Sequence, residues 1–111
     1  MAFLQKTLGQ ASLASSSVTT VYTVPASTQS IVKIIWIKNV TSGDLTVELW
    51  NVPNSGSPTD ANKLMNAQVI PANDFMQVYT DIPMETVGDS IQGKGSSNLG
   101  ITVNIYGAEI S

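Results

Sequence analysis

Apolar and polar residues alternate over much of this chain, with the period of two that a β-strand with one buried face requires. The alternation is clearest in Leu45–Val52, where leucine, valine and leucine hold the first three odd-numbered positions. It is equally clear in Leu99–Tyr106, where isoleucine, valine and isoleucine do so from position 101 onward. Both segments are therefore predicted to be strands that contribute to one core.

The segment Ile31–Val40 is apolar on both sides, which is typical of a strand in the centre of a sheet. Its many β-branched residues, and its lack of a helix-capping pattern, favour a strand over a helix. The connection Thr41–Asp44 is short and contains turn-forming residues. Ile31–Val40 and Leu45–Val52 are thus predicted to pair directly as a long β-hairpin.

Further short strands are predicted between turns that contain proline, glycine or asparagine: Thr19–Val24, Lys63–Ile70, Phe75–Thr80 and Asp89–Lys94. Seven or eight short strands without a convincing helix predict an all-β fold, a two-sheet antiparallel β-sandwich of jelly-roll or Greek-key type. The apolar residues predicted to form its core are Val21, Val24, Val32, Ile34, Trp36, Leu45, Val47, Leu49, Val69, Phe75, Val78, Ile91, Ile101, Val103 and Ile105.

The N-terminal segment has a weaker pattern. Its small residues Ala11–Ser17 offer little apolar surface to bury. We expect residues 1–17 to form a flexible N-terminal arm, followed by the β-sandwich domain at residues 18–111. The alternative is an ordinary first edge strand, since termini are loose unless they are tied down.

Composition narrows the possible functions. A chain of 111 residues is expected to form a single domain. Without cysteine or histidine it has no thiol nucleophile, no usual general base and none of the commonest metal ligands. Its five lysines are scattered, it has no arginine, and the net charge is -3, which argues against nucleic-acid binding. With no apolar run of membrane-spanning length, we expect no enzyme activity, no cofactor, no metal, and neither a nucleic-acid nor a membrane partner.

The one local cluster of acids is Asp81, Glu85 and Asp89. These carboxylates could offer oxygen ligands to Ca²⁺ or serve as the paired acids of a hydrolase. A solvated acidic loop is the commoner meaning of such spacing. No metal or catalytic residue is therefore assigned.

A contact surface is a more promising candidate. If Leu45, Val47 and Leu49 face the core, Trp50 projects outward, and Tyr106 does the same from the last strand. Outward aromatic residues can anchor a protein interface or stack on sugars, although a tryptophan covering a loop is an equal alternative for Trp50. With the apolar residues of the arm, the possible interface residues are Phe3, Leu4, Leu8, Trp50 and Tyr106.

Several segments together resemble a known group of proteins. These are Val21-Tyr-Thr-Val-Pro-Ala26, Ile31–Asn39, Leu45–Trp50, Val69-Ile-Pro-Ala72 and Gly88-Asp89. Their order is similar to that in small β-sandwich proteins encoded among the structural genes of tailed bacteriophages. The resemblance spans about residues 19 to 107 and concerns framework positions rather than a catalytic motif.

The resemblance implies a virion component without enzymatic activity. The expected role is a capsid decoration (cement) protein on the head surface, assembled in the host cytoplasm, whose partners are the major capsid protein and further copies of itself, as a trimer or dimer. The alternative is a tail- or fibre-associated module that binds host-surface carbohydrate, or another tail protein, with Trp50, Tyr106 and the loop Pro53–Asn62 as its site.

Overall fold

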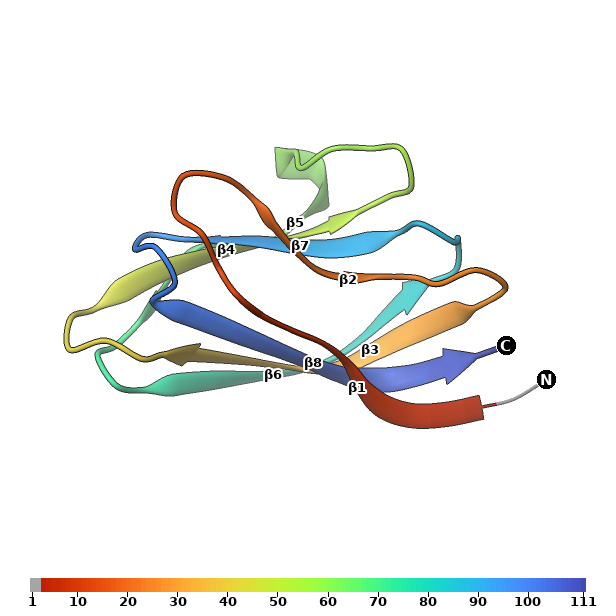
Figure 1. Cartoon of the computed structure of the whole chain (residues 1–111), viewed down its shortest axis with the longest axis horizontal. Helices are drawn as coiled ribbons and strands as arrows, with labels where there is room; N and C mark the ends of the chain where they lie inside the picture. The colour runs from red at the N-terminus through yellow and green to blue at the C-terminus, as the bar shows by residue number, and fades with distance from the viewer. Residues whose placement is uncertain (1–2) are drawn as a thin grey trace.

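A computed structural model describes residues 3–111, with side chains described from residue 5 onward. Two four-stranded antiparallel sheets lie one above the other (Figure 1), which confirms the predicted two-sheet β-sandwich. The first sheet has the order β1-β8-β3-β6 and the second the order β2-β7-β4-β5. The elements are β1 (Phe3–Ser12), β2 (Thr19–Thr23), β3 (Gln29–Asn39), β4 (Leu45–Val52), the 3-10 helix η1 (Asp60–Asn62), β5 (Lys63–Ile70), β6 (Phe75–Met84), β7 (Ser90–Gly95) and β8 (Ile101–Ile110).

The strand pairs are nested. β4 pairs with β5, β3 with β6, β2 with β7 and β1 with β8, all antiparallel. The chain is thus one long hairpin whose tip lies between β4 and β5. Folding this hairpin over adds the pairs β3–β8 and β4–β7 and places successive pairs in alternate sheets. This is the jelly-roll arrangement, one of the two topologies expected from the sequence.

The predicted hairpin between Ile31–Val40 and Leu45–Val52 is wrong, because β3 and β4 belong to different sheets. The side chain of Asn39, which is 1% exposed, organises the corner between them. Its Nδ2 donates to the carbonyl oxygens of Gly43 (2.8 Å) and Ile70 (2.9 Å), and its Oδ1 accepts from the backbone N and Oγ1 of Thr41. Turn-forming residues suit such a corner as well as a hairpin, so the sequence did not distinguish the two.

The N-terminal segment differs from the expected arm. Residues Phe3–Ser12 form the edge strand β1, paired with β8 from Phe3↔Ile110 to Ser12↔Thr102. Leu13, just beyond it, is fully buried, and its backbone bonds to Ile101 and Leu99. The small residues around Leu13 gave no indication in the sequence that it would be buried. The structure thus has the alternative, an edge strand, and no arm separates residues 3–17 from the sandwich.

Most of the predicted core is confirmed. Val21, Val24, Val32, Val47, Leu49, Ile91, Ile101, Val103 and Ile105 are buried in one cluster, and Leu45 and Val78 pack against it. The assignments of Ile34, Trp36, Val69 and Phe75 are wrong: the first two are only partly buried and each of the others is 51% exposed. The pattern missed Leu13, Tyr22, Ile35, Ile37, Ile70 and Met84, which complete the cluster.

An irregularity in β3 explains the reversed assignment there. Val32 is opposite Gly107 of β8, yet Ile34 is opposite the very next residue, Tyr106, so Lys33 is an extra residue in β3. A bulge of this kind inverts the alternation beyond it. As a result Ile35 and Ile37 enter the core, while Ile34 and Trp36 face outward.

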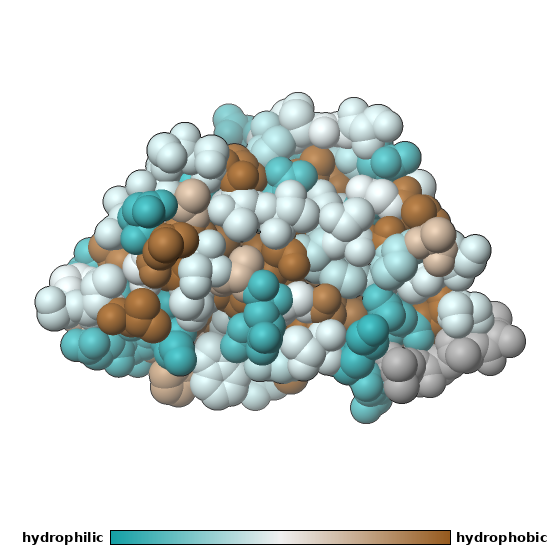
Figure 2. Space-filling view, viewed as in Figure 1, coloured by the Kyte–Doolittle hydropathy of each residue, from teal (hydrophilic) through white to brown (hydrophobic). Residues whose placement is uncertain are grey.

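The surface is mainly uncharged. In the face shown by Figure 2, pale side chains predominate, with a few strongly hydrophilic groups and separate brown patches between them. This agrees with a charged fraction of only 12%. Among the described residues, no helix is both long enough and apolar enough to cross a membrane.

Candidate interaction surface

The outer face of the first sheet carries most of the exposed aromatic side chains. Strand register places them in rows across the sheet, with Ile34 opposite Tyr106 on one side and Tyr79 on the other. Trp36 lies in the next row, and Phe75, at the start of β6, stacks on it with 5.0 Å between ring centroids and 25° between ring planes. We call Ile34, Trp36, Phe75, Tyr79 and Tyr106 the aromatic face.

Exposure differs along this face. Tyr79 is 73% exposed and Phe75 is 51% exposed, whereas Ile34, Trp36 and Tyr106 are partly buried by their neighbours. In the isolated molecule these large side chains expose apolar surface to water, and exposed apolar patches often mark interaction sites. The aromatic face therefore suits contact with another surface.

A groove of about 450 Å³ lies at one end of the aromatic face, where β1 and β3 flank β8. Both neighbours of β8 are irregular there: β1 has an extra residue, Leu8, and β3 has the extra residue Lys33. Bulges bend a strand and increase its twist locally, so the sheet surface is hollowed beside Tyr106. The groove is lined by Gln5, Lys6, Lys33, Ile34, Tyr106, Gly107 and Ala108.

The lysines at this groove are paired with acids. Lys6 Nζ lies 3.1 Å from Glu109 Oε1, and Lys33 Nζ is paired with Asp81. Both pairs are at the surface, where such pairs contribute little to stability. Their effect is to leave the groove apolar at its centre and nearly neutral at its rim.

The structure separates the five residues that the sequence suggested for an interface. Tyr106 lies on the aromatic face beside the groove. Leu8 is partly buried and packs against the core. The side chains of Phe3 and Leu4 lie outside the described part of the structure.

Trp50 is not the exposed aromatic residue that the alternation predicted. It lies outside the main core cluster, yet it is only 7% exposed. The Nζ atom of Lys63 lies 5.4 Å from the centroid of its ring, a cation–π contact. The lysine is held there by Glu48 Oε2 at 2.8 Å.

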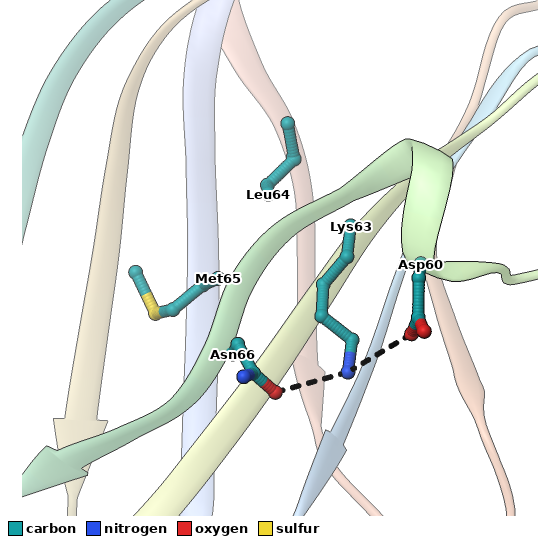
Figure 3. A pocket seen from close by; sticks show the side chains of 5 residues that line it. All are labelled: Asp60, Lys63, Leu64, Met65 and Asn66. Atoms are coloured by element: carbon teal, nitrogen blue, oxygen red, sulfur yellow. Dashed lines mark hydrogen bonds and ion pairs between the residues drawn. The ribbon is translucent and has the colours of Figure 1, made fainter.

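Lys63 also lines a hollow at the start of β5, which Figure 3 shows with Asp60, Leu64, Met65 and Asn66. In this view the ammonium group points toward Asn66 and Asp60, at 3.0 and 3.9 Å, while Leu64 and Met65 point away. The ammonium group of Lys63 is therefore already bound to partners within the chain. The same lysine lies over the ring of Trp50, so it is not free to bind a ligand in the hollow.

The acids Asp81, Glu85 and Asp89 do not converge. Asp81 is paired with Lys33, whereas Asp89 accepts hydrogen bonds from the backbone N of Asn54 and Thr86 and so organises a turn. Across residues 3–111, no three histidine, cysteine, aspartate or glutamate side chains group together as metal ligands. Neither the calcium site nor the acid pair of a hydrolase has a geometric basis here.

Sequence reasoning missed Trp36, Phe75 and Tyr79 as surface residues. The signal for β6 was present, because alternation in Phe75–Tyr79 puts Phe75, Gln77 and Tyr79 on one side and leaves Met76 and Val78 on the other. For Trp36 no such signal existed. Its orientation follows from the bulge at Lys33, which the sequence does not mark.

Comparison with known proteins gives a likeness in fold alone. No protein-family model matches the chain, and no curated protein matches it. A chain in the structure of the infectious bursal disease virus Gx strain is similar, with a TM-score of 0.52 and 11% identity, over 97% of this chain. This chain spans only 30% of the length of that one.

A second similar structure is the virus-like particle of the extra small virus of the giant freshwater prawn Macrobrachium rosenbergii. Its chain has a TM-score of 0.50 and 12% identity, and the match covers 100% of this chain and 81% of that one. Both structural neighbours thus come from virus or virus-like particles, and they share the sandwich architecture with this chain.

Proposed function

We propose that this chain is a structural protein of a virion, and specifically a decoration protein that binds the major capsid protein on the outside of the head. The observation that carries the proposal is the likeness in fold to chains of two virus particles, one of which this chain matches over its whole length. Fold alone does not determine function, so the docking surface has to follow from this chain's own residues.

The aromatic face is the proposed docking surface. Exposed aromatic side chains dominate the binding energy of protein interfaces because they bury a large area and lose little conformational freedom. Here Trp36 and Phe75 are already stacked, and Tyr106 borders an apolar groove. A projecting side chain of the capsid protein would fit that groove.

The physical role is stabilisation by binding. A protein that binds only the assembled shell shifts the equilibrium away from disassembly. Many identical copies on one shell add their contributions, because each shell subunit is held in place by several bound neighbours. No catalytic group or cofactor takes part, and the protein is placed on the capsid surface after assembly in the host cytoplasm.

The test is removal and restoration of the protein on purified particles of the virus that encodes it. Stripped particles should lose resistance to heat and osmotic shock, and the wild-type chain should restore it. Mass spectrometry of intact particles should count hundreds of copies. Unchanged resistance after complete removal, or only a handful of copies per particle, contradicts the decoration role.

A second candidate is a tail- or fibre-associated module that binds host-surface carbohydrate. The stacked pair Trp36–Phe75 beside the groove favours it, because sugar rings stack on such aromatic platforms. Trp50 is 7% exposed, so sugar binding at this face should be reported by the fluorescence of Trp36. Saturable quenching by a host glycan supports the receptor-binding role, and unchanged emission across a glycan panel contradicts it.

A further inference from the structure

The outer edge of β6 has the properties of a strand that pairs with another strand. β6 is the last strand of the first sheet, and within residues 3–111 no strand pairs with its second side. The stretch Phe75–Tyr79 contains no charged residue and no proline. Its register with β3 is regular, and the irregularity comes only beyond Tyr79. Lysines, prolines and bulges usually protect sheet edges, so this stretch is an unprotected edge.

The backbone parity of β6 determines which residues can bond to a partner. The backbone N of Asn39, in β3, donates to the carbonyl oxygen of Asp74 at 2.9 Å. Hydrogen-bonded and non-hydrogen-bonded pairs alternate along an antiparallel ladder. The backbone groups of Phe75, Gln77 and Tyr79 consequently point away from β3, toward the free edge. The backbone N of Phe75 donates there to Asp74 Oδ1 at 2.8 Å, a bond that a partner strand would replace.

The five residues of this stretch have a symmetric chemical order. Phe75-Met76-Gln77-Val78-Tyr79 has the sequence aromatic, aliphatic, amide, aliphatic, aromatic. A two-fold axis through Gln77 would therefore place each side chain opposite one of its own kind. Aromatic pairs and amide pairs across strands stabilise a sheet, and a two-fold interface requires such self-complementarity. An axis shifted by one residue, to Val78, would instead place Phe75 opposite the carboxylate of Asp81.

Exposed apolar residues are frequent on the two edge strands β5 and β6. β6 and β5 are the last strands of their sheets, at the ends opposite to β1 and β2. Of the eight large apolar side chains that are exposed, four belong to these two strands: Leu64, Val69, Phe75 and Tyr79. A second copy paired along β6 would cover the unpaired backbone and place its own exposed rings beside Phe75 and Tyr79.

We propose that this chain forms a symmetric dimer in which β6 pairs antiparallel with β6 of a second copy, with Gln77 on the two-fold axis. The two first sheets then form one continuous eight-stranded sheet, and the aromatic faces of both copies lie on the same side of it. The dimer does not depend on the virion role, and either can fail without the other.

The test uses opposite charges at position 77. In the proposed register the two side chains at this position lie roughly 5 Å apart, so like charges repel. Gln77→Lys and Gln77→Glu should each be monomeric in sedimentation equilibrium, with the 11.8 kDa mass of one chain, whereas the wild type has twice that mass. An equimolar mixture of the two variants should restore the dimer. Gln10→Lys, an exposed glutamine on the opposite edge strand β1, should leave the dimer unchanged.

Each other outcome overturns the proposal. A wild type that stays monomeric up to about 1 mM has less than about 4 kcal/mol of association free energy and excludes the dimer. A trimer excludes it too, since a two-fold contact closes at two copies. If the dimer survives Gln77→Lys, its interface lies elsewhere on the molecule. If the mixture of the two variants stays monomeric, the two side chains at position 77 do not face each other and the proposed register is wrong. Far-ultraviolet circular dichroism confirms that each variant is folded.

Discussion

At the scale of single residues, the buried hydroxyl of Tyr22 connects the two sheets at one end of the sandwich. Tyr22 comes from β2, and its hydroxyl lies 2.5 Å from Ser30 Oγ in β3 and donates to Glu109 Oε2 in β8 at 2.7 Å. Glu109 in turn pairs with Lys6 of β1. Buried polar groups stabilise a fold only when they are fully satisfied, and this chain of contacts satisfies each of them.

Replacing this hydroxyl should destabilise the fold. Tyr22→Phe keeps the ring in the core but leaves the Ser30 hydroxyl without a partner and Glu109 with Lys6 alone, which costs about 1–3 kcal/mol. Urea denaturation followed by tryptophan fluorescence measures the loss. Tyr79→Phe is the matched control, because that tyrosine is 73% exposed, and its effect should stay within about 0.5 kcal/mol. Equal effects of both changes would contradict the proposed connection.

The same contacts predict how stability depends on pH. The hydrogen bond from Tyr22, aided by Lys6, holds the pKa of Glu109 below its ordinary value of 4.5. Its contribution to stability is therefore present above pH 4.5 and is lost as pH falls through the lower folded value. Burial raises the pKa of Tyr22 from 10.0 to about 12, so the unfolded chain ionises first and stability decreases as pH rises from 10.0 toward 12.

Denaturation curves across this pH range check both slopes. In Tyr22→Phe the alkaline decrease should become shallower, and the acid decrease should shrink because Glu109 has lost its main hydrogen bond. Curves that match the wild type at both extremes would show that these groups are not coupled to folding.

At the scale of elements, the bulges in β1 and β3 decide which side chains reach the surface. They depend on close contact with β8, where an added Cβ on Gly107 would overlap the carbonyl oxygen of Ile31 and lie 3.1 Å from a methyl group of Leu8. The alternation of β3 is inverted by its extra residue, so Trp36 belongs to the aromatic face and Ile35 to the core.

Adding a methyl group at Gly107 should force these strands apart. Gly107→Ala is expected to destabilise the protein by about 1–3 kcal/mol, as overpacking does, and to alter the groove beside Tyr106. Urea denaturation gives the magnitude. Gly43→Ala is the control, since a Cβ there meets nothing within 4 Å. If Gly107→Ala is as stable as this control, β3 can move away from the added methyl group without lowering the free energy of unfolding, and the predicted overpacking is contradicted.

At the scale of the whole molecule, function depends on which surfaces the sandwich leaves uncovered. The aromatic face and the edge of β6 adjoin but serve different partners in our proposals: the shell for the first and a second copy for the second. Variants remote from the shared strand can therefore separate them.

Tyr106→Ser should weaken re-binding to stripped particles without affecting self-association. Tyr106 borders the groove, and truncating an aromatic anchor at an interface costs about 1.4 kcal/mol or more, a tenfold loss of affinity. Quantitative co-sedimentation with particles measures the affinity. Leu99→Ser, at a residue that is 56% exposed outside the strands, is the control and should bind as the wild type does. Undiminished binding by Tyr106→Ser would exclude the groove from the docking surface.

The strand content, the two-sheet sandwich and most of the core could be predicted from the amino-acid sequence, because strand alternation and burial are local consequences of residue type. The sequence pattern placed Val103 and Ile105 correctly, since both lie in a stretch of β8 whose alternation of burial is unbroken from Ile101 to Gly107. The remaining features depend on contacts that form only in the folded chain. The bulge at Lys33, the corner held by Asn39 and the burial of Trp50 under Lys63 all depend on residues that are distant in sequence. A local pattern contains no record of such contacts, and they determine which aromatic residues face a partner.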